Sequence, residues 1–310
     1  MNVIKFRCPS NTNPQVYKKA DIILFIDILN NTLPVKDKIV YKKTDSSKIL
    51  HKLLNEKMSL YKAKNKEWFW CNIISSLTTN KNIKKKIKQI DARTLRPEMP
   101  KEWLKNKVEW LSNYDILNVM MQYSNDKKYK YNFLGVFPID FAVEVNNKCL
   151  YSSVCSINVK NYIKKKIKYV GFITNLDKHD ESGSHWTSTF IILDPENSCY
   201  GAHYYDSTVK KIPKYIKIFI NRIKKQCNEL YPKIVFKITC NNKKHQNKNT
   251  ECGIFSMVYQ IRWINFLLHD KMFYKKKDAY KILVNDKNIK DNIMVEKRSN
   301  LFRPNILALK

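Results

Sequence analysis

The segment from Ile254 to Leu268 restricts the fold of this chain more than any other. Its apolar side chains fall on all sides of the helix that their spacing predicts, rather than along one stripe. A helix that is apolar all round has to be covered by other elements, because it has no face to present to water. The sequence therefore predicts a helix buried at the centre of a domain.

Cys252 lies directly before this helix, at the end of the polar loop Asn241–Glu251, and Gly253 follows it. A helix N-terminus offers unpaired N–H groups and a partial positive charge, and both favour a thiolate. A cysteine of the core would instead lie within an apolar stripe, as Cys227 does in the predicted helix that opens at Pro213. The position of Cys252 therefore indicates a nucleophile.

A cysteine nucleophile needs a base, and His185 is the best placed of the six histidines. His185 lies at the start of a predicted strand, next to Trp186. Gly183 lies two residues before His185, in a segment that is expected to be exposed. The β-rich segment Trp186–Leu193, the turn residues after it and the return segment Cys199–Tyr205 predict a β-hairpin.

The hairpin also predicts which carboxylate meets the base. In an antiparallel pair the second strand ends beside the start of the first, so Asp206 is expected next to His185. Asp194 is the rival, but it lies at the turn, roughly 25 Å away at about 3.3 Å per residue. We interpret Asp194 as a turn residue before Pro195, and expect Asp206 to hold the imidazole and favour its protonated form.

Gln246 lies six residues before Cys252, in the loop that leads to it. Its amide could donate to a developing oxyanion together with the Cys252 N–H group. An ordinary loop glutamine is an equally good interpretation of the spacing alone.

The chain has 310 residues, enough for one large domain or two modest ones. The segment Arg96–Pro100 interrupts helix propagation and is interpreted as a linker. We therefore expect a basic, mainly helical region at 1–95 and a second domain at 96–310. The elements predicted within them are helices at 47–60, 81–90 and 112–123, the last capped by Ser112 and Asp115, a strand and turn at 131–145, and strands at 168–174 and 233–240.

The formal net charge of +31 attracts polyanions and predicts non-specific nucleic-acid binding through a Lys-rich surface. However, 51 of the 58 basic residues are Lys, and Asn and Ile are also abundant. AT-biased coding accounts for that composition equally well, so both interpretations stay open.

The eight cysteines contain no CxxC pair, and the histidines show no HExxH pattern. No metal and no cofactor are therefore expected. The N-terminal residues 1–7 do not have the pattern of a secretory signal, and no apolar run approaches about 18 residues. We expect an intracellular protein with reduced thiols and no membrane contact.

Taken together, the motifs resemble a known family. The order His185-Trp186, Asp206-Ser207, Gln246 and Cys252-Gly253 is similar to that of the ubiquitin-like-protein-specific (SUMO-type) cysteine proteases, the adenain-like clan. Trp110-Leu111 resembles their upstream Trp-Leu motif. The blocks at 133–141 and 175–186 resemble the polyprotein-processing proteases of large nucleocytoplasmic DNA viruses, and the whole resemblance covers roughly residues 95–275.

The resemblance implies an α+β fold with a papain-like protease core, in which helices flank a central mixed sheet and the nucleophile begins a buried helix. It implies catalytic roles for His185, Asp206, Gln246 and Cys252. It also implies a substrate groove at Gly253 that Trp110 and Trp186 roof, so that only glycine-like side chains fit.

The function implied is a cysteine endopeptidase that cleaves after Gly-Gly or Ala-Gly sites and processes viral structural polyproteins during virion maturation. Its expected location is the virion and the host cytoplasm (the virus factory). A protease that removes SUMO or ubiquitin from host conjugates is the main alternative. An acetyltransferase of the same clan, and a Lys-rich nucleic-acid-binding virion protein with an incidental cysteine, are the others.

Overall fold

The computed structural model describes residues 17–145, 148–269 and 279–309. These residues form two compact units: 17–107 together with 299–309, and 108–298. The expected boundary at 95/96 therefore differs from the observed division, because 96–107 and the last described residues join the first unit. Arg303 explains the difference, since its guanidinium is paired with Asp91 and its backbone forms a bridge with Glu98.

The first unit is built from helices, as expected of the N-terminal region. Its apolar core includes Phe25, Leu54, Trp70 and Ile87. The helices predicted at 47–60 and 81–90 are confirmed, and Ser46 and Asn80 cap their N-termini. The elements of this unit are α1 (Lys19–Asn30), η1 (Val35–Asp37), α2 (Ser47–Lys57), η2 (Met58–Tyr61), η3 (Glu67–Phe69), α3 (Trp70–Ser76), α4 (Lys81–Thr94), η4 (Lys101–Leu104) and η6 (Ile306–Leu309).

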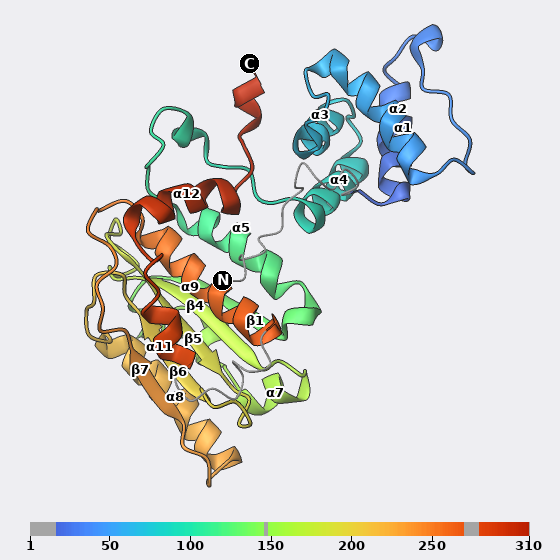
Figure 1. Cartoon of the computed structure of the whole chain (residues 1–310). Coiled ribbons are helices and arrows are strands. Elements are labelled where there is room, and N and C mark those ends of the chain that lie inside the picture. The colour runs from blue at the N-terminus through green and yellow to red at the C-terminus, as the bar shows by residue number, and fades with distance from the viewer. Residues whose placement is uncertain (1–16, 146–147, 270–278, 310) are drawn as a thin grey trace. The chain divides into compact units, whose positions relative to one another are not determined.

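The second unit is organised around a five-stranded mixed sheet (Figure 1). Its order is β1 (Tyr131–Phe137), β4 (Tyr169–Asn175), β5 (Trp186–Ile192), β6 (Gly201–Tyr205) and β7 (Lys237–Cys240). The three central strands are antiparallel, and the two outer pairs are parallel. The predicted α+β class with a central mixed sheet is thereby confirmed.

Helices cover both faces of this sheet. On one face α9 (Cys252–His269) packs through Trp263 on Phe190 and through Tyr259 on Tyr205. On the other, α8 (Lys214–Leu230) contributes Phe219, which meets Phe172 edge to face. Every residue from Cys252 to Ile264 is buried, so the prediction of a central buried helix is confirmed.

The remaining elements of this unit frame the sheet. They are α5 (Asn113–Ser124), η5 (Lys127–Tyr129), β2 (Glu144–Val145), β3 (Lys148–Cys149), α6 (Ser152–Cys155), α7 (Val159–Lys164), α11 (Ala279–Val284) and α12 (Asp291–Leu301), within which the unit boundary falls. The capping box predicted at Ser112 and Asp115 is present at the start of α5.

Two local expectations were wrong. The strand predicted at 233–240 is shorter in the structure: only its last four residues, β7, pair with β6. Val235, which precedes β7, is exposed. The cysteines are not all reduced, since Cys149 and Cys155 form a disulfide. The β2–β3 hairpin and α6 bring their Cα atoms to 6.2 Å, within the range that a disulfide spans.

Candidate active site

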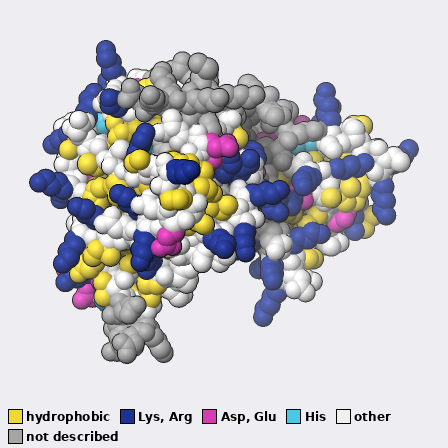
Figure 2. All heavy atoms as spheres, turned by 90° about the horizontal axis from the view of Figure 1, so that it is seen from below, with side chains coloured by type: hydrophobic (Ala, Val, Ile, Leu, Met, Phe, Trp, Pro, Cys, Tyr) yellow, Lys and Arg dark blue, Asp and Glu magenta, His cyan; other side chains and the backbone are white. Residues whose placement is uncertain are grey.

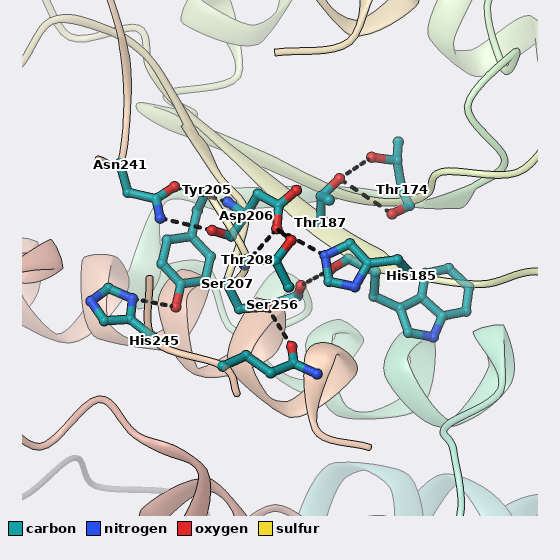
Figure 3. A network of polar contacts seen from close by, with 12 residues as sticks. Thr174, His185, Thr187, Tyr205, Asp206, Ser207, Thr208, Asn241, His245 and Ser256 are labelled. Atoms are coloured by element: carbon teal, nitrogen blue, oxygen red, sulfur yellow. Dashed lines mark hydrogen bonds and ion pairs between the residues drawn. The ribbon is translucent and has the colours of Figure 1, made fainter. Parts of the chain in front are cut away.

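The hairpin brings His185 and Asp206 together (Figure 3). Ser188 pairs with Tyr205 across β5 and β6, so the residues that flank this end of the hairpin meet. His185 Nε2 lies 2.9 Å from Asp206 Oδ1, and the Asp206 side chain is fully buried. Asp194 lies at the other end of the hairpin and forms an ion pair with Lys168, as its interpretation as a turn residue requires.

Further hydrogen bonds fix Asp206. Thr208 donates to its Oδ1 from the backbone N–H and from the hydroxyl, both at 2.7 Å. Asn241 accepts from the Asp206 N–H at 2.9 Å and donates to its carbonyl at 2.7 Å. Both the backbone and the carboxylate of Asp206 are thus held by hydrogen bonds, so the carboxylate can keep the His185 imidazole in one orientation.

The electrostatics of the pair favour an ionised carboxylate and a protonated ring. Burial by itself lowers the pKa of His185, but hydrogen bonds with Asp206 and Cys252 outweigh it and raise that pKa to about 9. Burial raises the pKa of Asp206, yet the hydrogen bonds from His185 and Thr208 bring it below its usual value. Since Nε2 of His185 faces Asp206, Nδ1 is the ring atom that remains for Cys252.

Cys252 is the first residue of α9 and is 4% exposed. The N–H groups of a first helical turn have no partner within the helix and point towards its leading end. A thiol at this point, beside the His185 imidazole, is arranged for attack on a carbonyl group, and the N–H groups of the first turn can stabilise the resulting oxyanion.

Gln246 is buried and connected to the residue that follows Asp206. Its Oε1 accepts from the Ser207 hydroxyl at 2.6 Å, and its Nε2 donates to the Lys248 carbonyl at 2.6 Å. The Ser207 carbonyl accepts from the backbone N–H groups of His245 and Gln246. The amide is therefore oriented, and Nε2 carries a second hydrogen that can serve another acceptor.

Arg298 was not among the residues predicted to belong to the site, and it braces the loop that leads to Cys252. Its guanidinium binds both carboxylate oxygens of Glu251, the residue before Cys252, at 2.8 and 2.9 Å. It also donates to the carbonyl groups of Thr250 and Glu109. Arg298 thus joins the start of α9 to the segment that carries Trp110. Arg298 and Glu251 are 47 residues apart, and Arg298 lies in a helix that was not predicted. Local sequence patterns therefore gave no indication of this ion pair.

The residues predicted to form the substrate groove lie close together. Trp186 Nε1 donates to the Leu111 carbonyl at 3.2 Å. A Cβ atom on Gly253 would approach Leu111 to 3.0 Å and Trp186 to 3.3 Å, so glycine permits the close approach of α9 to this wall. Trp110 is 43% exposed, and it lines a cleft of about 390 Å³ together with Trp186 and Gly183.

Two other histidines have structural partners. His203 is buried between Thr239 and the Cys199 carbonyl, and burial lowers its pKa to about 4. His245 connects Tyr205 to the Val284 carbonyl. In 17–145, 148–269 and 279–309, no cluster of three or more His, Cys, Asp or Glu residues is arranged to hold a metal ion. Within the same ranges, no helix has the length and apolarity needed to span a membrane.

The known proteins whose sequences are similar to this chain include viral cysteine proteases. No model of a known protein family matches the chain. A protein of Acanthamoeba polyphaga mimivirus that is named as a thiol protease is 30% identical over 180 residues, which are 56% of this chain and 52% of the relative. SUMO-1 cysteine proteases of African swine fever virus are 27% identical over 97 residues, 31% of this chain and 34% of theirs. The chain thus spans about half the length of the mimivirus relative and a third of the others.

Among solved structures, the crystal structure of the African swine fever virus protease superposes with a TM-score of 0.56 at 18% identity. The match covers 86% of this chain and 95% of that one, and it shows a shared fold. The resemblance to viral SUMO-type cysteine proteases and the protease-type fold are both confirmed.

Proposed function

We propose that this chain is a cysteine endopeptidase that cleaves polypeptides after Gly-Gly or Ala-Gly pairs, with viral structural polyproteins as its substrates. The observation that carries the proposal is the 2.9 Å contact of His185 with the buried Asp206, together with Cys252, which acts on the pKa of His185 from the start of the buried helix α9. The viral relatives that are named as cysteine and thiol proteases support it.

In the proposed reaction the Cys252 thiolate attacks the carbonyl carbon of the glycine before the scissile bond. The oxyanion accepts hydrogen bonds from Gln246 Nε2 and the Cys252 N–H group, at about 3 kcal/mol of stabilisation per donor. The C–N bond then breaks as His185 gives its proton to the leaving amine. Water, deprotonated by His185, hydrolyses the acyl-enzyme and releases the carboxylic acid and the thiol.

A direct assay separates this function from its alternatives. The protein would be incubated in parallel with glycine-pair peptides, viral polyproteins and ubiquitin-like precursors. Cleavage of the polyproteins after glycine pairs is expected. Relatives from African swine fever virus are named as SUMO-1 cysteine proteases. Preferential cleavage of the ubiquitin-like precursors would therefore support the host-conjugate alternative. Transfer of an acetyl group from acetyl-CoA without cleavage would support the acetyltransferase.

Replacement of Trp186 by alanine should widen the groove. Because Trp186 and Leu111 lie against Gly253, we expect the preference for glycine over alanine or leucine before the scissile bond to fall at least about tenfold, with slower turnover. The measurement is kcat/KM for peptides that differ only at that residue. Unchanged discrimination would contradict the proposed roof.

We also propose non-specific nucleic-acid binding and a location in the virion and the cytoplasmic virus factory. Figure 2 shows Lys and Arg side chains spread over the face in view, with few acidic ones between them, and Lys-rich surfaces of this kind bind phosphates without reading bases. Purified virions analysed by mass spectrometry would test the location, which fails if they lack this chain.

The DNA-binding proposal predicts a strong dependence on salt. The affinity for duplexes of unrelated sequence should be similar, and should fall by about 10³-fold or more between 50 and 200 mM salt if six or more phosphates are neutralised. Fluorescence anisotropy measures both quantities. Undetectable binding at low salt would leave AT-biased coding as the explanation of the charge.

A further inference from the structure

The cleft beside Trp186 has two chemically different walls. Trp110, Trp186 and Gly183 belong to its lining, whereas Cys252, His185 and Gln246 do not. The end of β1 and the residue before α6 supply an apolar wall: Val136, Phe137, Pro138 and Tyr151. The last residue of β4 and the loop that follows it supply a polar wall: Asn175, Lys178, His179, Glu181 and Ser182.

His179 is held in this polar wall by a buried carboxylate. Asp140 is 5% exposed, and its Oδ2 lies 2.6 Å from His179 Nδ1. Its Oδ1 accepts from the His179 backbone N–H at 3.1 Å. A further hydrogen bond, from the Ile139 N–H to the Asp177 carbonyl, ties the two loops together. The ring is thereby positioned with Nδ1 engaged, which leaves Nε2 as the donor that can meet a ligand.

The His179 ring and Lys178 are the basic groups that can meet an anion here, whereas the carboxylates of Asp140, Asp180 and Glu181 reduce the positive charge around them. The hydrogen bond with Asp140 raises the pKa of His179 above its usual value, so the protonated form is more populated near neutral pH. Lys178 adds a second basic group to the lining. Glu181 opposes them, but its Oε2 already accepts from the Lys178 N–H at 2.7 Å, so part of its hydrogen-bonding capacity is used within the loop.

The position of the cleft indicates which part of a substrate enters it. It shares Trp110 and Trp186 with the groove expected to hold the glycine pair, but none of the reacting groups line it. A chain whose glycines pass between these tryptophans to Cys252 would therefore place its preceding residues in the cleft. The apolar wall suits the methylene groups of such a residue, and the polar wall suits its charged end.

We propose that His179, positioned by Asp140, is a specificity-determining residue that binds the carboxylate of an acidic substrate side chain, glutamate best, located before the glycine pair. This inference rests on the proposed function and adds to it a preference for acidic sequences on the acyl side. It predicts that the His179 imidazole, rather than the net positive charge of the protein, determines which cleavage sites are preferred.

Matched peptides test the proposal. Glutamate, glutamine, leucine or lysine would be placed in turn at each of the two positions before Gly-Gly, and kcat/KM measured for each. In the unmodified protein we expect the glutamate peptide to exceed the glutamine peptide about five- to tenfold at one position, as for a partly exposed charge-assisted contact. His179→Gln should reduce this ratio to about one, whereas Glu181→Gln should increase it.

A control separates the specific contact from general attraction. Lys225 is exposed on α8, outside the cleft, and Lys225→Gln removes one positive charge as His179→Gln does. It should leave the glutamate-to-glutamine ratio unchanged. Cleavage without a preference for glutamate, or a preference that survives His179→Gln, overturns the subsite while the protease activity stands. Absence of cleavage of every glycine-pair peptide overturns the proposed function and the subsite together.

Discussion

Replacement of Cys252 by alanine is expected to lower kcat/KM for a glycine-pair peptide by about 10⁴-fold or more, because the attacking atom itself is removed. The fold should survive, since alanine fits at the start of α9 and the change removes only one sulfur atom from a buried position. Peptide cleavage and thermal unfolding, measured on the same preparation, check the two halves of this prediction.

Cys227 provides the matched control. It is also buried, but it lies in the α8 core, where burial raises the pKa of its thiol to about 11. Cys227→Ala should lower the melting temperature through the small cavity it leaves and retain cleavage by the folded molecules. Activity that survives in Cys252→Ala, or is lost only in Cys227→Ala, would contradict the assignment of the nucleophile.

Replacement of Asp206 by asparagine should lower kcat/KM by about 10³- to 10⁴-fold, the scale seen when the carboxylate of a Ser-His-Asp triad is changed in this way. An asparagine cannot stabilise the imidazolium ion, and its amide group can force the wrong tautomer on His185. Asp194→Asn, at the opposite end of the hairpin, is the control and should keep its activity within a few-fold.

The same substitution should change the pH profile. The pKa of His185 is raised to about 9 from its usual 6.5, so the stabilising contact of its protonated ring with Asp206 is complete below pH 6.5. It is lost as the pH rises through about 9. Activity that needs the imidazolium should fall on the same alkaline limb, and Asp206→Asn should move that limb to lower pH. A limb that does not move would show that Asp206 is not the group that raises this pKa.

Local sequence signals were sufficient for the elements that bring the site together. The all-round apolarity of 254–268 predicted the buried helix α9, and the hairpin geometry placed Asp206 rather than Asp194 beside His185. Ser112 and Asp115 predicted the start of α5 correctly. Each of these inferences uses residues within about twenty positions of one another, where chain geometry leaves few alternatives.

The support around the site could not be predicted, because it depends on residues that meet only after folding. Arg298 reaches Glu251 from α12, and Asn241 reaches Asp206 from the end of β7. Arg303 draws the last described residues to the first unit through Asp91. A sequence shows such residues as isolated polar positions, and periodicity gives no indication of which distant partner each will satisfy.

The most direct test of the central claim is a glycine-glycine peptide that carries a thiol-reactive electrophile in place of the scissile carbonyl, followed by mass mapping of the labelled residue. We expect the label on Cys252, and much slower labelling in His185→Ala. A label that appears on another cysteine, or labelling of Cys252 that is independent of His185, would contradict the account.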